Sequence, residues 1–403
     1  MTKTSDWIVV GGGITGTSVS YELARQGVSV ALLEPQGILS GESQGATRFS
    51  YGGLAFWAGT TALTRQLYQE GFHRHQILSQ ELAHNTQFRE LDLLLTIPAT
   101  ADPEAVSHLY HTVEIVPQLL TVAQACEREP LLNPQALSGA LWVKQGHICP
   151  TATTQAYGQA FLRQGGQLVK DVVINVIREG NRVRGVQTPT ETYWGENVVI
   201  CAGGMSRRLL QGAGVTLPLY FTHAEILETP PLSDLRLQTM IMPAQQQRWQ
   251  LEETVSISPV SDQWEQPDQE LAPAILDPGI VQFLDGHCRI GQISRAISNP
   301  EATVNQQESE EKLRQAIGDI LPKLRDIPAT CRHSIVAFSA DHLPLIGTVE
   351  PGLSLFAGLS NPLVMIPALA QRFANSAVNH QPDSILEELS PRRFTNSEQR
   401  NPG

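Results

Sequence analysis

Three glycines and one glutamate near the start of the chain have the types and spacing of a nucleotide-binding site. Gly11, Gly13 and Gly16 form the pattern G-x-G-x-x-G, and Glu34 follows 18 residues later. Such glycines permit a tight turn, the approach of a pyrophosphate to the backbone, and close packing of a helix against a strand. The Glu34 carboxylate can accept hydrogen bonds from both hydroxyls of a ribose, and its charge would repel a 2′-phosphate, which disfavours NADP.

These residues need a strand, a helix and a second strand to position them, and the surrounding sequence predicts all three. Residues 8–10 are apolar, residues 14–27 have a helical pattern that ends in glycine, and residues 28–33 form a second apolar run. A pyrophosphate would then meet free N–H groups at the positive end of a helix dipole. The alternative is a glycine-rich turn beside a surface glutamate. Such a turn would not require a strand, a helix, a second strand and an acidic residue to follow one another at this spacing. We therefore expect an ADP-containing dinucleotide to contact Gly11, Gly13, Ile14, Thr15, Gly16, Glu34 and Pro35.

The segment that follows the glutamate favours FAD over NAD. Residues 41–53 are rich in Gly, Ser and Thr, whereas an NAD-binding domain would normally continue with another strand and helix. A loop of small residues suits a backbone that passes beneath an isoalloxazine ring.

With this segment the sequence resembles the superfamily of FAD enzymes that contains D-amino-acid oxidase, glycine oxidase and sarcosine oxidase, over about residues 5–375. Four separated blocks carry the resemblance. The first is the glycine motif with its glutamate, and the second, residues 45–53, is similar to the family's segment beneath the flavin. The third spans residues 141–206. The fourth, residues 339–365, is similar to the family's T-P-D-x-x-P-x-I-G and the loop that follows it.

The resemblance implies an α/β fold with two interleaved domains. One is a Rossmann-like FAD-binding domain of the glutathione-reductase type, and the other is an α+β substrate domain built on a mainly antiparallel sheet. The expected division is 1–75, 141–215 and 330–385 for the FAD-binding domain, 76–140 and 216–329 for the substrate domain, and 386–403 for a loose tail. Residues 256–279 are polar and contain prolines, so we expect a long loop there, a candidate active-site cover. Asp285-Gly286 is expected to join two strands.

The resemblance also implies which later residues hold the cofactor. The loop beneath the flavin, the strand ends that return to the dinucleotide fold and the start of the last long helix would supply Thr47, Arg48, Gly52, Gly53, Val173, Ala202, Gly203, Gly358, Leu363 and Val364. Some relatives attach flavin covalently, but Cys331 lies three residues further from Asp341 than their pattern requires. We therefore expect non-covalent FAD.

In the family, amine-oxidising members move a hydride from the carbon beside nitrogen to flavin N5, and oxygen or another acceptor then takes the electrons. The resemblance therefore implies a small amine or amino acid as substrate. Arg48 aligns with a residue beside the flavin, and Arg289 falls where sarcosine-type enzymes place a lysine that helps reduced flavin react with oxygen. Arginine and lysine differ in geometry and hydration, and the alternative for Arg289 is a solvated residue on a hairpin.

The family's usual substrate anchors are missing. Amino-acid-oxidising members commonly carry an arginine where Val336 stands, and a lysine of the sarcosine-type enzymes would map near Val364. Because an unpaired carboxylate in a closed site is costly, either another residue binds it or the substrate is not a simple α-amino acid. The candidate substrate contacts are Tyr51, Arg332, His342 and Asn361. Two other functions stay open: a catalytically weak or inactive flavoprotein with an assembly or scaffold role, and an FAD-dependent hydroxy-acid dehydrogenase.

Composition excludes several other classes of protein. The 403 residues carry 28 Lys plus Arg against 40 Asp plus Glu, a net charge of −12, so nucleic acid and anionic membranes are poor partners. No apolar stretch reaches the roughly 20 uninterrupted residues of a membrane helix, and no metal-binding motif occurs. Five cysteines without a C-x-x-C pair favour a reducing, cytoplasmic location.

Overall fold

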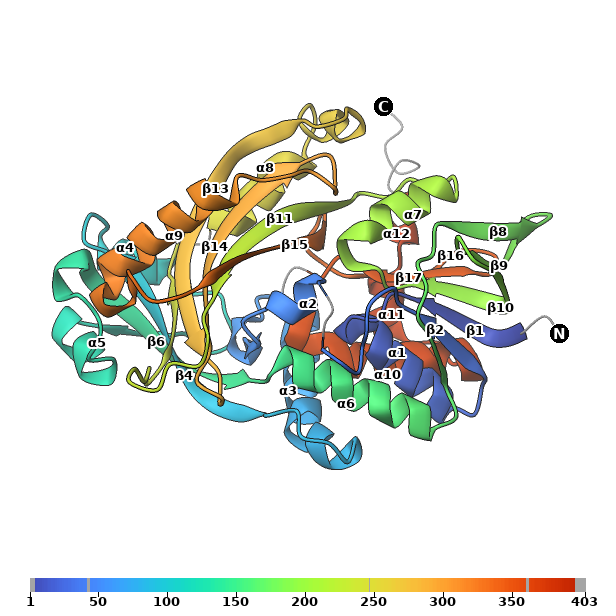
Figure 1. Ribbon diagram of the computed structural model, residues 1–403, viewed down its shortest axis with the longest axis horizontal. Coiled ribbons are helices and arrows are strands. Elements are labelled where there is room, and N and C mark those ends of the chain that lie inside the picture. Colours follow the sequence, from blue (N-terminus) through green and yellow to red (C-terminus); the bar gives the residue numbers. More distant parts are fainter. Residues whose placement is uncertain (1–3, 42–43, 246, 360–361, 396–403) are drawn as a thin grey trace.

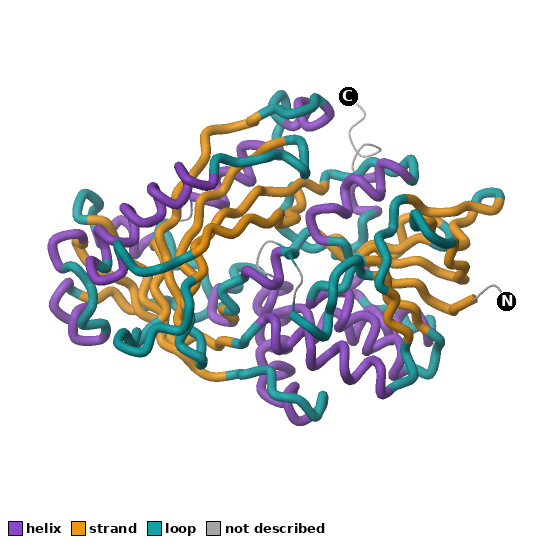
Figure 2. The backbone as a smooth tube through the Cα atoms, viewed as in Figure 1, coloured by secondary structure: helices purple, strands orange, loops and turns teal. Residues whose placement is uncertain are grey.

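The structure is a computed structural model, which describes residues 4–41, 44–245, 247–359 and 362–395. Two sheets lie side by side, and the short helix α2 (Ala46–Phe49) lies between them (Figure 1). The sheet nearer the N-terminus has a parallel centre, and the other is mainly antiparallel. Figure 2 shows that a layer of helices lies below the N-terminal sheet and that few helices cover the other sheet. The predicted mixed α/β fold class is confirmed.

The first sheet joins strands that are far apart in the sequence. Its order is β16-β17-β10-β1-β2-β7, with the hairpin of β8 and β9 beside β10. Its strands are β1 (Thr4–Val10), β2 (Val30–Leu33), β7 (Gln167–Val169), β8 (Asn175–Glu179), β9 (Arg182–Gln187), β10 (Thr192–Ile200), β16 (Leu345–Glu350) and β17 (Leu353–Ala357). Val10 pairs with both Leu33 and Ile200, so the carboxyl ends of three parallel strands meet at one edge. Open α/β sheets bind their ligands at such an edge.

Both faces of this sheet are covered because its strands direct apolar side chains to each side. Trp7 and Val9 belong to one apolar cluster, whereas Ile8 and Val10 belong to another. The first cluster includes α1 (Ile14–Arg25), α3 (Ala62–Glu81), α6 (Pro150–Arg163), α10 (Pro362–Asn379) and α11 (Ser384–Glu388). The second includes α7 (Ser206–Gly212) and α12 (Arg392–Thr395).

The second sheet has the order β15-β11-β14-β13-β12-β4-β6-β3, with β5 beside β6, and its one described parallel pair is β12 with β4. Its strands are β3 (Gly53–Leu54), β4 (Arg89–Pro98), β5 (Gln118–Leu120), β6 (Leu137–His147), β11 (Leu219–Glu228), β12 (Met240–Pro243), β13 (Glu270–Gln282), β14 (Cys288–Ile297) and β15 (Thr330–Ser339). Its helices are α4 (Pro103–His108), α5 (Val122–Arg128), α8 (Gln247–Ser256) and α9 (Gln306–Ile320). Helix α9 lies across the outer face of this sheet (Figure 1), where Leu313 and Ile317 enter its apolar cluster.

The expectation of a long loop over residues 256–279 is wrong. Helix α8 ends at Ser256, a short 3₁₀ turn covers Ser261–Glu265, and β13 begins at Glu270. Pro273 and Pro278 concealed this strand from sequence reasoning, and they lie where the register of β13 against β14 shifts. Bulges of this kind accommodate proline within a sheet. The strand connection predicted at Asp285-Gly286 is confirmed, since β13 pairs with β14 across it.

The expected loose tail also differs in part from the structure. Residues 386–395 contribute to α11 and α12, and Leu389 is fully buried. Arg393 donates hydrogen bonds to the Asp341 carboxylate at 2.8 and 2.9 Å. Residues 396–403 lie outside the described residues, and the division of the chain into two domains stays a prediction.

Candidate functional site

The glycine motif forms a tight connection between β1 and α1. Gly11 has a φ of +100°, and a Cβ there would lie 2.7 Å from the carbonyl oxygen of Cys201. A Cβ on Gly16 would lie 1.8 Å from the carbonyl oxygen of Gly11, far inside van der Waals contact. Both positions therefore require glycine.

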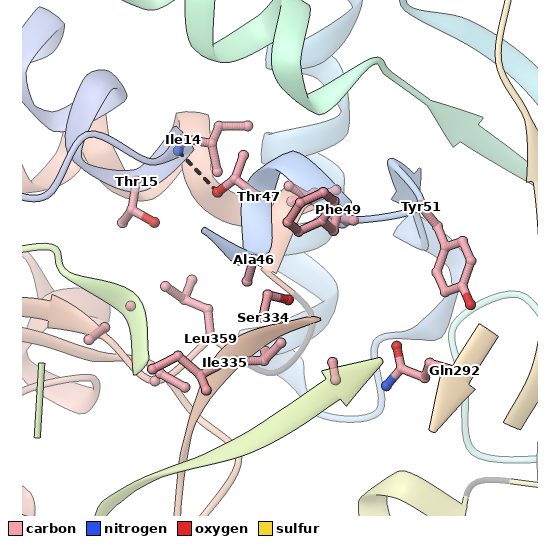
Figure 3. Close-up of a pocket in the computed structure, with 18 of the residues that line it drawn as sticks. Ile14, Thr15, Ala46, Thr47, Phe49, Tyr51, Gln292, Ser334, Ile335 and Leu359 are labelled. Atoms are coloured by element: carbon pink, nitrogen blue, oxygen red, sulfur yellow. Dashed lines mark hydrogen bonds between the residues drawn. The ribbon is translucent and has the colours of Figure 1, made fainter. Parts of the chain in front are cut away.

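The start of α1 is open toward the second sequence block. Its N-cap, Gly13, offers no side-chain cap, and the Ile14 N–H donates a hydrogen bond to Thr47 Oγ1 at 3.3 Å (Figure 3). The N–H groups of a first helical turn have no partner within the helix, and the helix dipole adds partial positive charge there. The start of α1 can therefore bind an anionic group such as a pyrophosphate.

Glu34 is fixed beside the glycine turn. Its Oε2 accepts a hydrogen bond from the Gly12 N–H at 2.7 Å, and its Oε1 accepts one from the Gln36 N–H at 3.1 Å. Burial raises the pKa of this carboxyl, and the two backbone hydrogen bonds oppose that effect. The remaining acceptor capacity of a carboxylate suits ribose hydroxyls, as the sequence predicts.

A cavity of about 170 Å³, which we call the cradle cavity, lies where the carboxyl edge of the first sheet faces the second sheet (Figure 3). From the second sheet, β11 contributes Ala224 and Ile226, and β15 contributes residues 334–337. Val336, which stands where relatives carry an arginine, is among these lining residues. Six of the predicted cofactor residues line the cradle cavity, and each of the four sequence blocks supplies at least one of them. They are Ile14, Thr15, Thr47, Gly203, Gly358 and Leu363.

The other predicted cofactor residues do not line the cradle cavity: Gly11, Gly13, Gly16, Glu34, Pro35, Arg48, Gly52, Gly53, Val173, Ala202 and Val364. Ala202 contacts the glycine turn, since its Cα would be 2.8 Å from a Cβ on Gly11. Val364 is fully buried in α10, and Val173 belongs to the apolar cluster on the other face of the sheet.

The two arginines proposed for catalysis meet at one carboxylate, Glu228, at the end of β11. Arg48 Nη1 lies 2.5 Å from Glu228 Oε1, and Arg289 Nε lies 3.6 Å from the same oxygen. Arg332 Nε lies 3.4 Å from Glu228 Oε2. Burial acts to raise the pKa of the Glu228 carboxyl, but the hydrogen bond and charge of Arg48 and the charge of Arg289 hold it below its usual range. Sequence reasoning missed Glu228, because nothing in the spacing connects it to Arg48.

Arg289 is a buried residue, so the alternative of a solvated arginine on a hairpin is wrong. It is 1% exposed, donates a hydrogen bond to the Ser50 carbonyl oxygen, and lies 4.5 Å from the centre of the Phe283 ring. Burial and the neighbouring Arg48 lower its pKa to about 10. Neither arginine lines the cradle cavity, but Ser50, which receives the Arg289 hydrogen bond, does.

A second, larger cavity of about 600 Å³, the wide chamber, adjoins the first. The two cavities share Ser50, Tyr51, Arg248, Gln292 and Leu363. Of the predicted substrate contacts, Tyr51 lines both cavities and His342 lines the wide chamber. Arg332 lines neither and pairs with Glu228 instead, and Asn361 lies outside the described residues.

Two charged residues of the cavities, Arg248 and Asp277, were not predicted. Arg248 Nε donates a hydrogen bond to Glu252 Oε1 at 2.8 Å. Burial raises the pKa of Asp277 to about 6, against the opposing charge of Arg248. One signal was available in the sequence, since Arg248 is the only Lys or Arg between Arg236 and Arg289.

Comparisons with known proteins agree with this geometry. The family model described as "FAD dependent oxidoreductase" (DAO) matches residues 6–376. The 4-methylaminobutanoate oxidase (formaldehyde-forming) of Paenarthrobacter nicotinovorans is 30% identical over 222 residues, covering 53% of this chain and 26% of that protein. The glycine oxidase of Geobacillus kaustophilus is 28% identical over 230 residues, covering 55% of this chain and 60% of that protein. The matches thus span between about a quarter and three fifths of these relatives.

The solved structures extend the likeness of the fold to nearly the whole chain. The crystal structure of glycine oxidase from Geobacillus kaustophilus has a TM-score of 0.77 at 21% identity, covering 97% of this chain and 99% of that chain. Among the described residues, no helix is long and apolar enough to cross a membrane. All five cysteines are free of disulfides.

Proposed function

Because the chain belongs to the DAO family of FAD-dependent oxidoreductases, we propose that it oxidises the carbon–nitrogen bond of a small amine or amino acid. The observation that carries this proposal is the make-up of the cradle cavity. Thr15 and Gly203 of the dinucleotide fold line one side, and Ile226 and Val336 of the second sheet line the other. A molecule bound there also adjoins the wide chamber, which can receive a second reactant.

The residues of this chain fit non-covalent FAD. The first turn of α1 offers N–H donors to the pyrophosphate, and the carboxylate of Glu34 offers acceptors to the ribose. When bound, FAD supplies the acceptor for the hydride that leaves the carbon beside nitrogen, and it passes the electron pair on to oxygen or another acceptor. The protein binds, orients and shields the reactants.

Two features of the chain would stabilise negative charge in the cradle cavity. Helix α10 begins at Pro362, and Leu363 in its first turn lines the cavity, so the positive end of an 18-residue helix is at its wall. Behind Ser50, Arg48 and Arg289 together carry one more charge than Glu228 neutralises. With a pKa of about 10, Arg289 keeps its proton at neutral pH. We assign both arginines an electrostatic role.

The apolar lining of the cradle cavity would exclude water from the reaction. Phe49, Ile226, Ile335 and Leu359 line it, and Figure 3 shows Phe49 in the same short helix as Thr47 and Ile335 on β15 of the second sheet. Excluding water strengthens each electrostatic interaction with the charges described above.

Anaerobic mixing of the purified, FAD-loaded protein with a panel of amines tests the proposal. The panel contains glycine, sarcosine, proline, D-amino acids and secondary amines, and flavin absorbance is followed. We expect at least one member to bleach the flavin. Reduction by dithionite but by no amine would overturn the proposal and favour a scaffold flavoprotein. Bleaching only by 2-hydroxy acids would favour a hydroxy-acid dehydrogenase.

A further inference from the structure

Among the described residues that line the cradle cavity, Arg248 is the only one with a charged side chain. It lies in the first turn of α8 and also lines the wide chamber, so it is at the junction of the two cavities. The neighbouring wall contains Val336, where relatives carry the arginine that binds a carboxylate. Helix α8 therefore brings the guanidinium group of Arg248 to a cavity that has Val336 in place of the arginine of its relatives.

The Arg248 side chain is held in place and keeps hydrogen-bonding capacity. Its Nε donates to Glu252 Oε1 at 2.8 Å, and Glu252 is fully buried one turn later in the same helix. Its Nη2 is buried without a hydrogen-bond partner in the described structure. A guanidinium fixed on one edge presents its other N–H groups in a planar fork, which matches the two oxygens of a carboxylate.

Two further polar atoms at this junction are buried without a partner among the described residues. They are Tyr51 Oη and Asp277 Oδ1, and Asp277 is 7% exposed. Tyr51 lines both cavities, and Asp277 lines the wide chamber. The charges of Arg248 and Asp277 both act on Tyr51, yet no ion pair joins their side chains in the described structure. Unpaired buried polar groups are costly, so a cation, an anion and a phenol here indicate a ligand with complementary groups.

We propose that the junction binds a zwitterionic amino acid, whose carboxylate contacts Arg248 and Tyr51 and whose ammonium group faces Asp277. This inference rests on the proposed function and deepens it. It names the residue that replaces the arginine absent at Val336 and makes α8 a substrate-binding element. It also favours amino acids over simple amines, because a simple amine would leave Arg248 Nη2 and Tyr51 Oη without a hydrogen-bond acceptor or donor.

The wide chamber adds a preference for an apolar group on the substrate. Its wall beyond the junction is rich in aromatic and long aliphatic side chains, including Trp57, Leu93, Leu95, Tyr110, Met240 and Met242. Burial of an apolar substituent against such a surface is favourable. The amino acid that fits this site best has a bulky apolar group and is larger than glycine.

Binding is tested without turnover by a matched pair of cyclic acids. In 1-aminocyclohexane-1-carboxylate the carbon beside nitrogen has no hydrogen, so its carbon–nitrogen bond cannot be oxidised by hydride loss. Cyclohexanecarboxylate lacks the amine, and cyclohexanecarboxamide lacks the charge. Each is titrated into the FAD-loaded protein, and the dissociation constant is taken from the flavin difference spectrum and from calorimetry. We expect the amino acid to bind best and the amide not to bind.

The variants separate the two charges. Arg248→Met should weaken binding of both acids at least tenfold, whereas Asp277→Asn should weaken the amino acid and spare cyclohexanecarboxylate. Since Arg248→Met leaves Glu252 buried without its partner, the double variant with Glu252→Gln keeps the test valid if the single variant fails to fold. Arg208→Met is the matched control, because Arg208 pairs with Glu301 on the surface, with 59% of its side chain exposed.

Equal binding of the amino acid by wild type and by the folded Arg248 variants would overturn this inference. Equal weakening of both acids by Asp277→Asn would overturn the assignment of the ammonium group. Neither result depends on whether any amine bleaches the flavin. Failure of this inference is therefore distinguishable from failure of the proposed function.

Discussion

Arg48 and Glu228 lie 180 residues apart in the sequence, and their Nη1 and Oε1 atoms lie 2.5 Å apart in the structure. The pair connects α2, which follows Gly45 and contains Thr47, with the last residue of β11 in the second sheet. Because Arg289 and Arg332 approach the same carboxylate, three guanidinium groups from three other segments surround one acidic group. The cluster therefore holds α2 against the second sheet.

Removing that carboxylate should destabilise the protein. Glu228→Gln would leave three guanidinium groups close together with no negative charge between them, and we expect a loss of about 3 kcal/mol in the free energy of unfolding. Urea denaturation of the FAD-loaded protein measures it. The matched control is Glu301→Gln, whose carboxylate pairs with Arg208 on the surface and should cost less than about 0.5 kcal/mol. Equal losses from the two variants would contradict the role of the cluster.

The charge of Arg289 should affect the oxidative half of the reaction. We expect Arg289→Met to slow the reaction of the reduced protein with oxygen on the order of tenfold or more. Arg289→Lys keeps the charge but not the hydrogen-bond geometry, so it should recover part of that rate. Stopped-flow mixing of the dithionite-reduced protein with oxygenated buffer measures the rate. An unchanged rate in a folded Arg289→Met protein would contradict the electrostatic role of Arg289 and would leave it only the structural role of holding Ser50 in place.

Asp277 should lower stability at alkaline pH. Its pKa in the folded protein is about 6, above the ordinary value of 3.8, so the folded state binds the proton more tightly and loses stability as pH rises through that interval. Asp277→Asn removes this penalty. We expect the variant to be more stable than wild type by up to about 3 kcal/mol at pH 8 and similar to it at pH 4. Denaturant titrations at both pH values test this, and a gain that does not change with pH would contradict it.

Buried histidines should make the protein sensitive to acid. Burial lowers the pKa of His75 to about 4 and that of His147 to about 3. The unfolded chain therefore takes up these protons first, and stability is lost as pH falls from about 6.5 toward 4. We expect His75→Gln to reduce the slope of the free energy of unfolding against pH in this range. The reduction should correspond to about one fewer proton taken up on unfolding. An unchanged slope in a folded His75→Gln protein would contradict this prediction.

FAD should leave the protein when the protein is unfolded. No cysteine or histidine occurs among the described residues that line the cradle cavity. Cys331 packs instead with the apolar cluster beneath α9, and burial raises the pKa of its thiol to about 11. Acid denaturation followed by filtration should release all the flavin into the filtrate. Yellow colour that stays with the polypeptide would show a covalent bond.

The sequence predicts the first strand–helix–strand unit well because its features are local. Gly11, Gly16 and Glu34 lie within that unit, and the two glycines occupy backbone positions that only certain residue types allow. The later blocks could be placed because each resembles a segment with one position in the family fold. Thr47 beside the start of α1 is an example.

The charged cluster and the cavity walls of the second sheet could not be predicted because they depend on contacts between distant segments. Glu228 acquires its role from Arg48 and Arg289, and no pattern in the sequence connects the three. Arg248 was overlooked because its helix precedes a segment whose prolines indicated a loop. The strand β13 that in fact forms there places Asp277 in the wide chamber with Arg248.

The position of β1 in the middle of its sheet has a consequence for protein synthesis. On the ribosome, Ile8 emerges long before Val198, its partner in β10, and Val198 in turn pairs with Leu353 of β17. One edge of β1 can pair early with β2, but its other edge stays unpaired until β10 has been translated. Exposed strand edges of this kind invite aggregation. We expect the chain to need chaperone protection during translation and to capture its cofactor only after β17 has been synthesised.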